Sequence, residues 1–167
     1  MGLFRRAPQL PPEHRHRLVL TDDDVLAAVE MADHRWAVAT RRALHVVDDT
    51  EVSRWPWSQV DQGRLDPVEH TLTVHIVDGG EVVLALLDKT TSRPFAATFR
   101  ERVQQSIVCS CDVSVPHGVV YVTIRRAEDD TLFSQVVNPG AVDLHDPEVA
   151  ALVQSAEARV REAAGMS

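Results

Sequence analysis

Two cysteines and a histidine are the residues of this chain whose spacing comes closest to that of a metal site. Cys109 and Cys111 stand two residues apart, so on a strand both thiols project from the same face, with His117 a short distance along the chain. A structural zinc site needs four ligands, and the sequence offers no second pair at a suitable spacing. We therefore interpret the two cysteines as small packing residues and expect neither a metal nor another cofactor.

No other group of residues predicts catalysis. His70 and His75 would fall on opposite faces of a strand, and the acidic runs at 22–24 and 128–130 are typical of a capping segment and a solvated turn. The sequence contains no GxGxxG, GxxxxGK[ST], GxSxG or HExxH motif. We assign no catalytic residue, although an enzyme whose site is assembled from scattered residues stays open.

Charge and composition exclude several classes of partner. The 25 acidic and 17 basic residues give a net charge of −8, which opposes general binding to nucleic-acid phosphates. No apolar run approaches the roughly 20 residues that span a bilayer, and the opening residues lack the apolar stretch of a signal peptide. Free cysteines fit a reducing compartment, so we expect a cytoplasmic protein. A chain of 167 residues can form one domain or two small, closely packed ones.

The N-terminal segment, residues 1–17, is rich in proline and arginine and shows no apolar periodicity. We expect a flexible basic tail, with order beginning near Leu18. Some of its side chains could contact an anionic membrane surface or a partner protein, namely Phe4, Arg5, Arg6, Arg15 and Arg17. A solvated terminus is the favoured interpretation of the same residues.

Alternating apolar residues predict several strands in the first half of the chain. Hairpins are expected over 36–47 and 70–87, and a strand over 51–57 is interrupted at Pro56. A helix is expected over about 93–106, capped by Ser92. The apolar row of this helix has to be covered, so we expect it to share one core with the 70–87 hairpin. The row consists of Phe95, Phe99 and Val103.

The segment that precedes the first hairpin is ambiguous. Thr21 followed by three aspartates is typical of a helix cap, and the apolar residues between Val25 and Ala32 keep helical spacing. The local pattern therefore predicts a helix over 25–32, with a strand as the alternative.

The second half of the chain is expected to form a three-stranded meander followed by a terminal helix. Strands are predicted over 108–115, 119–126 and 131–137. Asp146 can cap a helix with Pro147 at its first position. This helix has one apolar stripe, formed by Val149, Leu152, Val153, Ala156 and Val160.

Two segments resemble the bacterial PH-like domain family. Residues 36–44 are similar to a family strand that ends in Thr followed by Arg and Leu, and residues 55–60 are similar to its segment of proline, aromatic, polar, polar and aliphatic residues. The resemblance covers residues 20–107 and implies a bent antiparallel barrel that is capped by a helix and used for recognition. It also implies a strand at 25–32 and seven strands in all, where the sequence pattern indicates six.

The expected fold class is α+β: a PH-like antiparallel barrel or bent sheet capped by a helix, followed by a three-stranded meander and a C-terminal helix. The expected division is a tail at 1–17, a β-rich domain at 18–107 and an extension at 108–167 packed on the first part. The leading hypothesis is a non-catalytic protein-binding or scaffolding module, whose partner could be another copy of the chain. A peripheral membrane adaptor that uses the basic arm is the alternative from another class.

Overall fold

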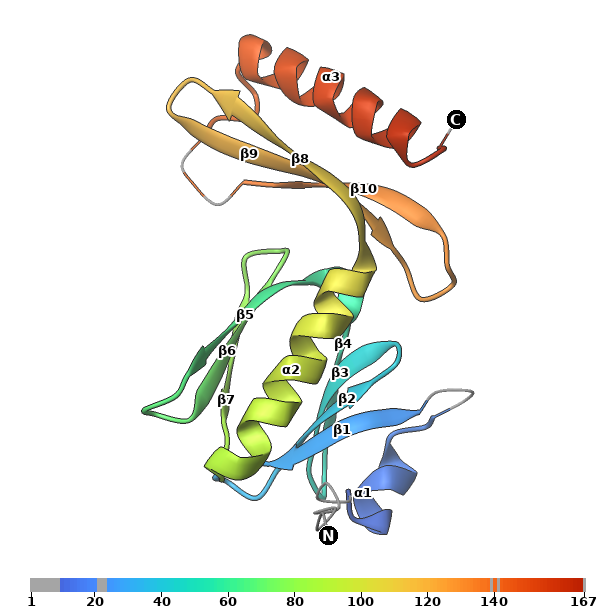
Figure 1. The fold of residues 1–167 in the computed structure, drawn as a ribbon, viewed down its shortest axis with the longest axis vertical. Helices are drawn as coiled ribbons and strands as arrows, with labels where there is room; N and C mark the ends of the chain where they lie inside the picture. The colour runs from blue at the N-terminus through green and yellow to red at the C-terminus, as the bar shows by residue number, and fades with distance from the viewer. Residues whose placement is uncertain (1–9, 21–23, 139, 141, 167) are drawn as a thin grey trace, which may run out of the picture. The chain divides into compact units, whose positions relative to one another are not determined.

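The computed structural model describes residues 10–20, 24–138, 140 and 142–166 of the chain (Figure 1). This described part contains ten strands in three antiparallel sheets and three α-helices, which confirms the α+β class. The chain divides into two compact units, Met1–Gln104 and Gln105–Ser167, close to the boundary expected after residue 107. We call them unit 1 and unit 2.

Unit 1 is built from two antiparallel sheets, a short helix and most of a long helix. The first sheet has the strand order β1-β2-β3-β4 and the second the order β5-β6-β7. The elements are α1 (Pro12–Arg17), β1 (Val25–Glu30), β2 (Trp36–Thr40), β3 (Ala43–Val47), β4 (Val52–Pro56), the 3-10 helix η1 (Trp57–Gln59), β5 (Val60–Asp66), β6 (Thr71–Ile76), β7 (Glu81–Ala85) and α2 (Lys89–Ser106). The hairpins predicted over 36–47 and 70–87 are confirmed as β2–β3 and β6–β7.

The two sheets of unit 1 meet at one corner, where the end of β1 reaches the end of β7. Met31 and Leu86 form an isolated antiparallel bridge there. The Leu87 amide also donates to the Glu30 carbonyl at 3.0 Å. These contacts occupy part of the outer edge of β7, whereas β5, at the other edge of the same sheet, pairs only with β6 among the described strands.

β1 corrects the helix that the local pattern predicts over 25–32, and the expected cap at Thr21 lies outside the described residues. Ala28 packs on the outer side of the first sheet, while Val29 packs in the interior core. Because both faces of this strand are covered, its apolar residues do not alternate with polar ones, and their spacing matches a helical period by coincidence. A strand here is what the family resemblance implies.

β5 is the strand that the sequence pattern did not reveal. It has neither an apolar run nor a regular alternation, since only its first residue, Val60, is fully buried and Gln62–Arg64 are exposed. Its backbone pairs with β6 from Val60 opposite Ile76 to Asp66 opposite Thr71. A strand held mainly by backbone hydrogen bonds leaves little trace in hydrophobic periodicity.

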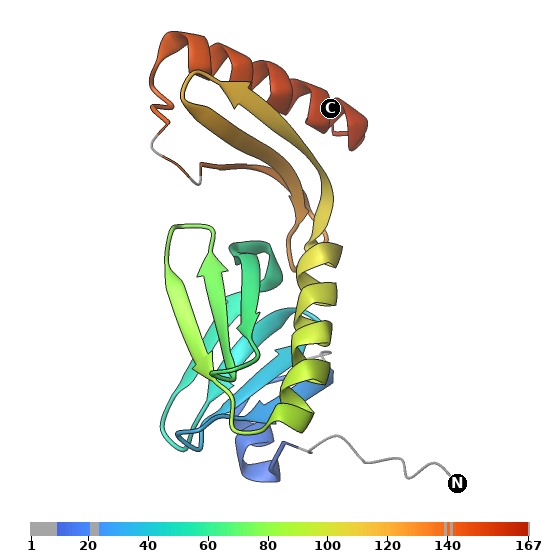
Figure 2. The same ribbon diagram turned by 60° about the vertical axis from the view of Figure 1, so that its left-hand side comes forward.

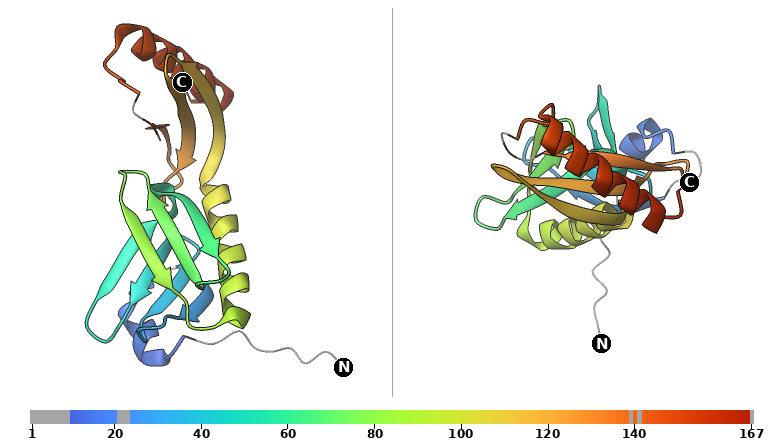
Figure 3. Two further views of the ribbon diagram at one scale, coloured as in Figure 1. Left: turned by 90° about the vertical axis from the view of Figure 1, so that its left-hand side faces the viewer. Right: turned by 90° about the horizontal axis from the view of Figure 1, so that it is seen from above.

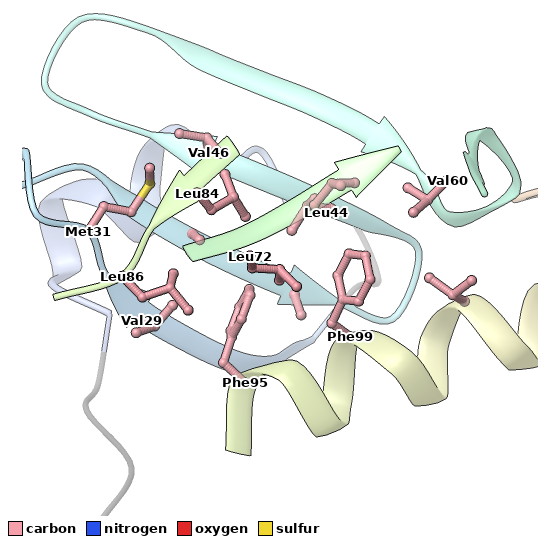
Figure 4. Close-up of a cluster of buried hydrophobic side chains, with 14 of the residues drawn as sticks. Val29, Met31, Leu44, Val46, Val60, Leu72, Leu84, Leu86, Phe95 and Phe99 are labelled. Carbon is pink, nitrogen blue, oxygen red and sulfur yellow. The ribbon is translucent and has the colours of Figure 1, made fainter. Parts of the chain in front are cut away.

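α2 covers the interior core of unit 1, and Figure 4 shows Phe95 and Phe99 pointing from the helix into this core. The indole of Trp57 meets the Phe99 ring edge-on, with centroids 5.6 Å apart and ring planes at 79°. The core shared between the helix and the 70–87 hairpin is confirmed. Its members from these two elements are Leu72, Val74, Leu84, Leu86, Phe95, Phe99 and Val103.

The start of α2 corrects the cap predicted at Ser92. The helix begins at Lys89, so Ser92 lies in its first turn. Asp88 is the capping residue: its Oδ1 accepts the Thr90 amide at 3.1 Å, and its carbonyl accepts the Ser92 amide at 3.0 Å. The sequence pattern pointed to Ser92 because Pro94 commonly opens a helix, yet this proline lies inside α2.

α1 corrects the expectation that order begins near Leu18. Leu10 and Leu18 flank this short helix, and both are buried on the outer face of the first sheet against Trp36, Val38 and Val47. The two leucines stand eight residues apart, so they produce no apolar periodicity in the sequence. This cover explains why every residue of β2 and β3 is buried, including those that point away from the interior core.

Unit 2 is a three-stranded sheet with one helix on one of its faces (Figure 3). Its elements are β8 (Ile107–Val115), β9 (Gly118–Arg126), β10 (Leu132–Val137) and α3 (Pro147–Ala163), which confirm the predicted meander and terminal helix. Asp146 caps α3 as predicted, accepting the amides of Glu148 and Val149 at 2.8 and 3.3 Å. Leu152 is a correction to the predicted stripe, because 40% of its surface is exposed.

Candidate functional site

The basic residues predicted to contact a membrane or partner are only partly described. Those outside the described residues are Phe4, Arg5 and Arg6. Arg15 and Arg17 lie on α1, and both are exposed. The Arg17 guanidinium donates to the Asp49 carbonyl in the turn after β3, so it is engaged by the protein's own backbone. Of the predicted set, the structure therefore describes only Arg15 and Arg17, which lie two residues apart on α1 and so point to different sides of the helix.

The turn beside Arg17 contains a carboxyl group with a lowered pKa. The amides of Thr50 and Glu51 donate to Asp48 Oδ1 at 2.6 and 2.7 Å, and the Thr50 hydroxyl donates to the same atom at 2.8 Å. These bonds lower the pKa of Asp48 from 3.8 to about 2, with a smaller contribution from the positive charge of Arg17. The shift follows from the geometry of an Asx turn, in which the side chain binds the following backbone amides.

Cys109 and Cys111 are half-buried on β8, and both thiols are free. They pack against the core of unit 2, and the Cys109 thiol donates to the Val160 carbonyl at 3.5 Å. Within the described part of the chain, no group of three or more His, Cys, Asp or Glu side chains could hold a metal ion. The position of Cys109 and Cys111 against this core agrees with their interpretation as packing residues.

The outer edge of β5 runs beside α2 in unit 1 (Figure 2). Gly63 lies against Phe99, because a Cβ atom on Gly63 would come within 2.2 Å of Phe99 Cε1. A glycine here permits the strand and the ring to approach closely. Gln62, Gly63 and Arg64 are nevertheless exposed, and since Gly63 has no side chain its exposed surface belongs to the backbone of β5. We call Gln62–Arg64 and the adjacent flank of α2 the β5–α2 seam.

A shallow cleft lies at one end of the β5–α2 seam, between the last residues of β5 and the first turn of α2. Its volume is about 10 Å³, and its lining includes Leu65, Asp66, Lys89 and Arg93. Sites for small-molecule ligands usually measure hundreds of Å³. The cleft therefore does not suggest a small-molecule site, but it shows which flank of α2 faces β5.

That flank of α2 carries a row of three cations. Lys89, Arg93 and Arg100 are four and seven residues apart, so they lie on one side of the helix, and all three are exposed. Their side chains form no ion pair or hydrogen bond with any of the described residues. The seam thus combines an open strand edge with three cations that have no acidic partner in the described part of the protein.

Two carboxylates at the Lys89 end of the seam are engaged by nearby backbone amides. Asp66 accepts the amides of Glu69 and Val68 at 3.0 and 2.8 Å, and these bonds, together with the charge of Arg64, lower its pKa. Asp88 caps α2, as described above. These interactions hold the two carboxylates in local turns rather than in pairs with the cations of α2.

Unit 2 has a second exposed surface on the face of its sheet that α3 does not cover. Tyr121 and Val119 of β9 are 39% and 38% exposed there, and Asp112 of β8 lies opposite Tyr121 in the strand register. Farther along β9 on this face, the Arg125 guanidinium donates to the Ser106 hydroxyl at 3.0 Å. Among the described residues, this face combines an exposed aromatic ring with a buried arginine.

Comparison of the chain with family models, with curated proteins and with solved structures finds no match. Among the described residues, no helix combines the length and the apolar character needed to cross a bilayer.

Sequence reasoning missed the β5–α2 seam because it missed β5. One signal was available: a single glycine, Gly63, in an otherwise extended segment often marks a place where another group approaches the backbone closely. The sequence also holds a second signal, the spacing of Lys89, Arg93 and Arg100. This spacing fits one flank of a helix once α2 is known to begin before residue 93.

Proposed function

We propose that this protein is a non-catalytic protein-binding module that takes an extended segment of its partner as an additional strand on the edge of β5, beside α2. The observation that carries the proposal is the exposed run Gln62–Arg64 on a strand edge without a neighbouring strand among the described residues. Such an edge presents backbone N–H and C=O groups that can pair with another chain. Strand addition of this kind is a common mode of peptide recognition.

The other strand edges are less suited to this role. β4 contains Pro56, whose ring removes a backbone donor, and β7 is bridged to the end of β1 through Leu86 and Met31. In unit 2, β10 is half-buried along its whole length, and β8 alternates between half-buried and exposed residues over most of its length. β5 is the edge strand whose three consecutive central residues are all exposed.

A PH-like architecture for unit 1 is part of the proposal. Four strands, then three strands, then a helix that shares their core correspond in order to the bent, helix-capped barrel that the resemblance of residues 36–44 and 55–60 implies. A barrel of this kind is used for recognition, which supports a binding role. The membrane adaptor is less well supported, because Arg17 of the basic arm donates to the carbonyl of Asp49.

The test is a selection of random peptides on the immobilised full-length protein, followed by titration of the enriched peptides into ¹⁵N-labelled protein. We expect the largest amide shifts at Gln62–Arg64 and on α2, while β7, the other edge of the same sheet, serves as the internal control. Shifts confined to unit 2, or no enrichment of any peptide, would contradict the proposal. Sedimentation over a concentration series tests whether another copy of the chain is the partner.

A further inference from the structure

We infer that the segment bound at the β5–α2 seam is acidic, with carboxylates at alternate positions that face Lys89, Arg93 and Arg100. This inference rests on the proposed function, because it names the chemistry of the partner for the same seam. It depends on a separate observation, the row of exposed cations on α2: Lys89 and Arg93 line the cleft beside the end of β5, and Arg100 follows on the same side of the helix by its spacing.

The spacing of the cations fits an extended segment. Lys89 and Arg100 are eleven residues apart, which corresponds to about 16 Å along a helix axis. An extended chain spans that distance in about five residues. Alternate side chains of a strand point to one side, so carboxylates at every second residue of a segment added to β5 can all face the row.

The charge of the row is a local exception in this protein. The whole chain has a net charge of −8, so most of its surface repels an acidic segment, whereas Lys89, Arg93 and Arg100 have no acidic partner among the described residues. Arg64 adds a further cation on the exposed part of β5. Complementary charge of this kind favours one class of partner over others.

The acidic groups of the seam indicate where along the row the partner's charge should lie. Asp66 and Asp88 are near Lys89, and their negative charge would partly offset the attraction of that end for an acidic segment. Arg93 and Arg100 lie farther along α2. We therefore expect these two arginines to contribute more to binding than Lys89.

The inference can be tested with two fluorescein-labelled peptides of one composition, Glu-Thr-Glu-Thr-Glu-Thr-Glu and Glu-Glu-Thr-Thr-Thr-Glu-Glu, titrated with the full-length protein. The first places all four carboxylates on one side of a strand, whereas the second divides them between two sides. Since a surface charge pair typically contributes 0.2–1 kcal/mol, we expect the alternating peptide to bind about 2- to 30-fold more tightly. Equal affinities would mean that only net charge is recognised, and would overturn the inference.

Two double variants separate the cation row from the overall charge of the protein. Arg93→Gln with Arg100→Gln should weaken the alternating peptide by about 2- to 30-fold, and thermal melts verify that both double variants are folded. The control, Arg15→Gln with Arg159→Gln, removes the same charge from exposed positions on α1 and α3 and should change the affinity by less than about twofold. Equal losses in the two double variants would overturn the inference.

The same titrations distinguish failure of this inference from failure of the proposed function. If neutral or lysine-containing peptides shift the amides of Gln62–Arg64 and acidic peptides do not, the acidic partner is wrong, while strand addition at β5 stands. If no peptide of any charge shifts these amides, both the inference and the proposed function fail.

Discussion

The close approach of Gly63 and Phe99 predicts a measurable energetic coupling between β5 and α2. A methyl group at position 63 would lie 2.2 Å from Phe99 Cε1 and 2.8 Å from Cζ, so the ring or the strand has to move. Inserting an extra carbon into a packed site costs about 1–3 kcal/mol. We therefore expect Gly63→Ala to lower the free energy of unfolding of unit 1 by that amount.

The second half of the experiment is Phe99→Ala. This ring is 3% exposed and lies edge-on against Trp57, so its removal leaves a cavity and also breaks an aromatic contact. Truncation of a buried phenylalanine costs about 3–5 kcal/mol, which is a large part of the 5–15 kcal/mol that stabilises a typical domain.

In the double variant, the methyl group at position 63 occupies part of the space that the Phe99 ring leaves. The combined loss should therefore be smaller than the sum of the single losses by about 1–3 kcal/mol. Urea unfolding followed by tryptophan fluorescence suits this measurement, because all three tryptophans, at positions 36, 55 and 57, belong to unit 1. Additive losses, or a Gly63→Ala protein with an unchanged midpoint, would refute the packing argument.

Three further predictions concern other parts of the chain. Deleting residues 1–17 removes α1 and the buried Leu10, so it should lower the melting temperature of unit 1 by roughly 10 °C or more. Deleting residues 1–9 is the control, because it leaves α1 and Leu10 in place. The pKa of Asp48 is lowered from 3.8 to about 2. The stabilisation that Asp48→Asn removes should therefore be full above about pH 5 and should be lost as the pH falls through 2 in acid titrations followed by fluorescence. Replacing Cys109 and Cys111 with alanine should lower the free energy of unfolding of unit 2 by about 1–2 kcal/mol and leave the zinc content unchanged in elemental analysis. Stoichiometric zinc that disappears in this variant would contradict the packing role.

Several parts of the fold that could be predicted have one buried and one solvated face, whereas the β2–β3 hairpin, buried on both faces, is marked by two short apolar runs. The hairpin of β6 and β7 and the stripe of α3 have one solvated face, and the alternation or helical spacing of their apolar residues reflects it directly. The turn residues and the Asp146 cap add local signals that do not depend on distant parts of the chain.

The parts that could not be predicted depend on contacts that are distant in sequence. Leu10 and Leu18 cover the outer face of the sheet that contains β1, a contact that no local pattern reveals. Because both faces of β1 are therefore covered, its apolar residues do not alternate, and their spacing predicts a helix instead. β5 was missed because its pairing with β6 does not require apolar side chains. The β5–α2 seam could not be predicted without β5, because the cations of α2 form a candidate site only together with the neighbouring strand edge.

α2 connects the stability of unit 1 with its proposed binding role, and its geometry keeps the two separable. Phe95 and Phe99 point into the interior core, whereas Arg93 and Arg100 lie on an exposed flank about 130° away around the helix. Loss of a core side chain affects folding and therefore binding, because the flank is positioned by the packing of the helix. Loss of the arginines leaves the core contacts in place, so a binding defect without a change in the urea midpoint would place the defect on the exposed flank rather than in the core.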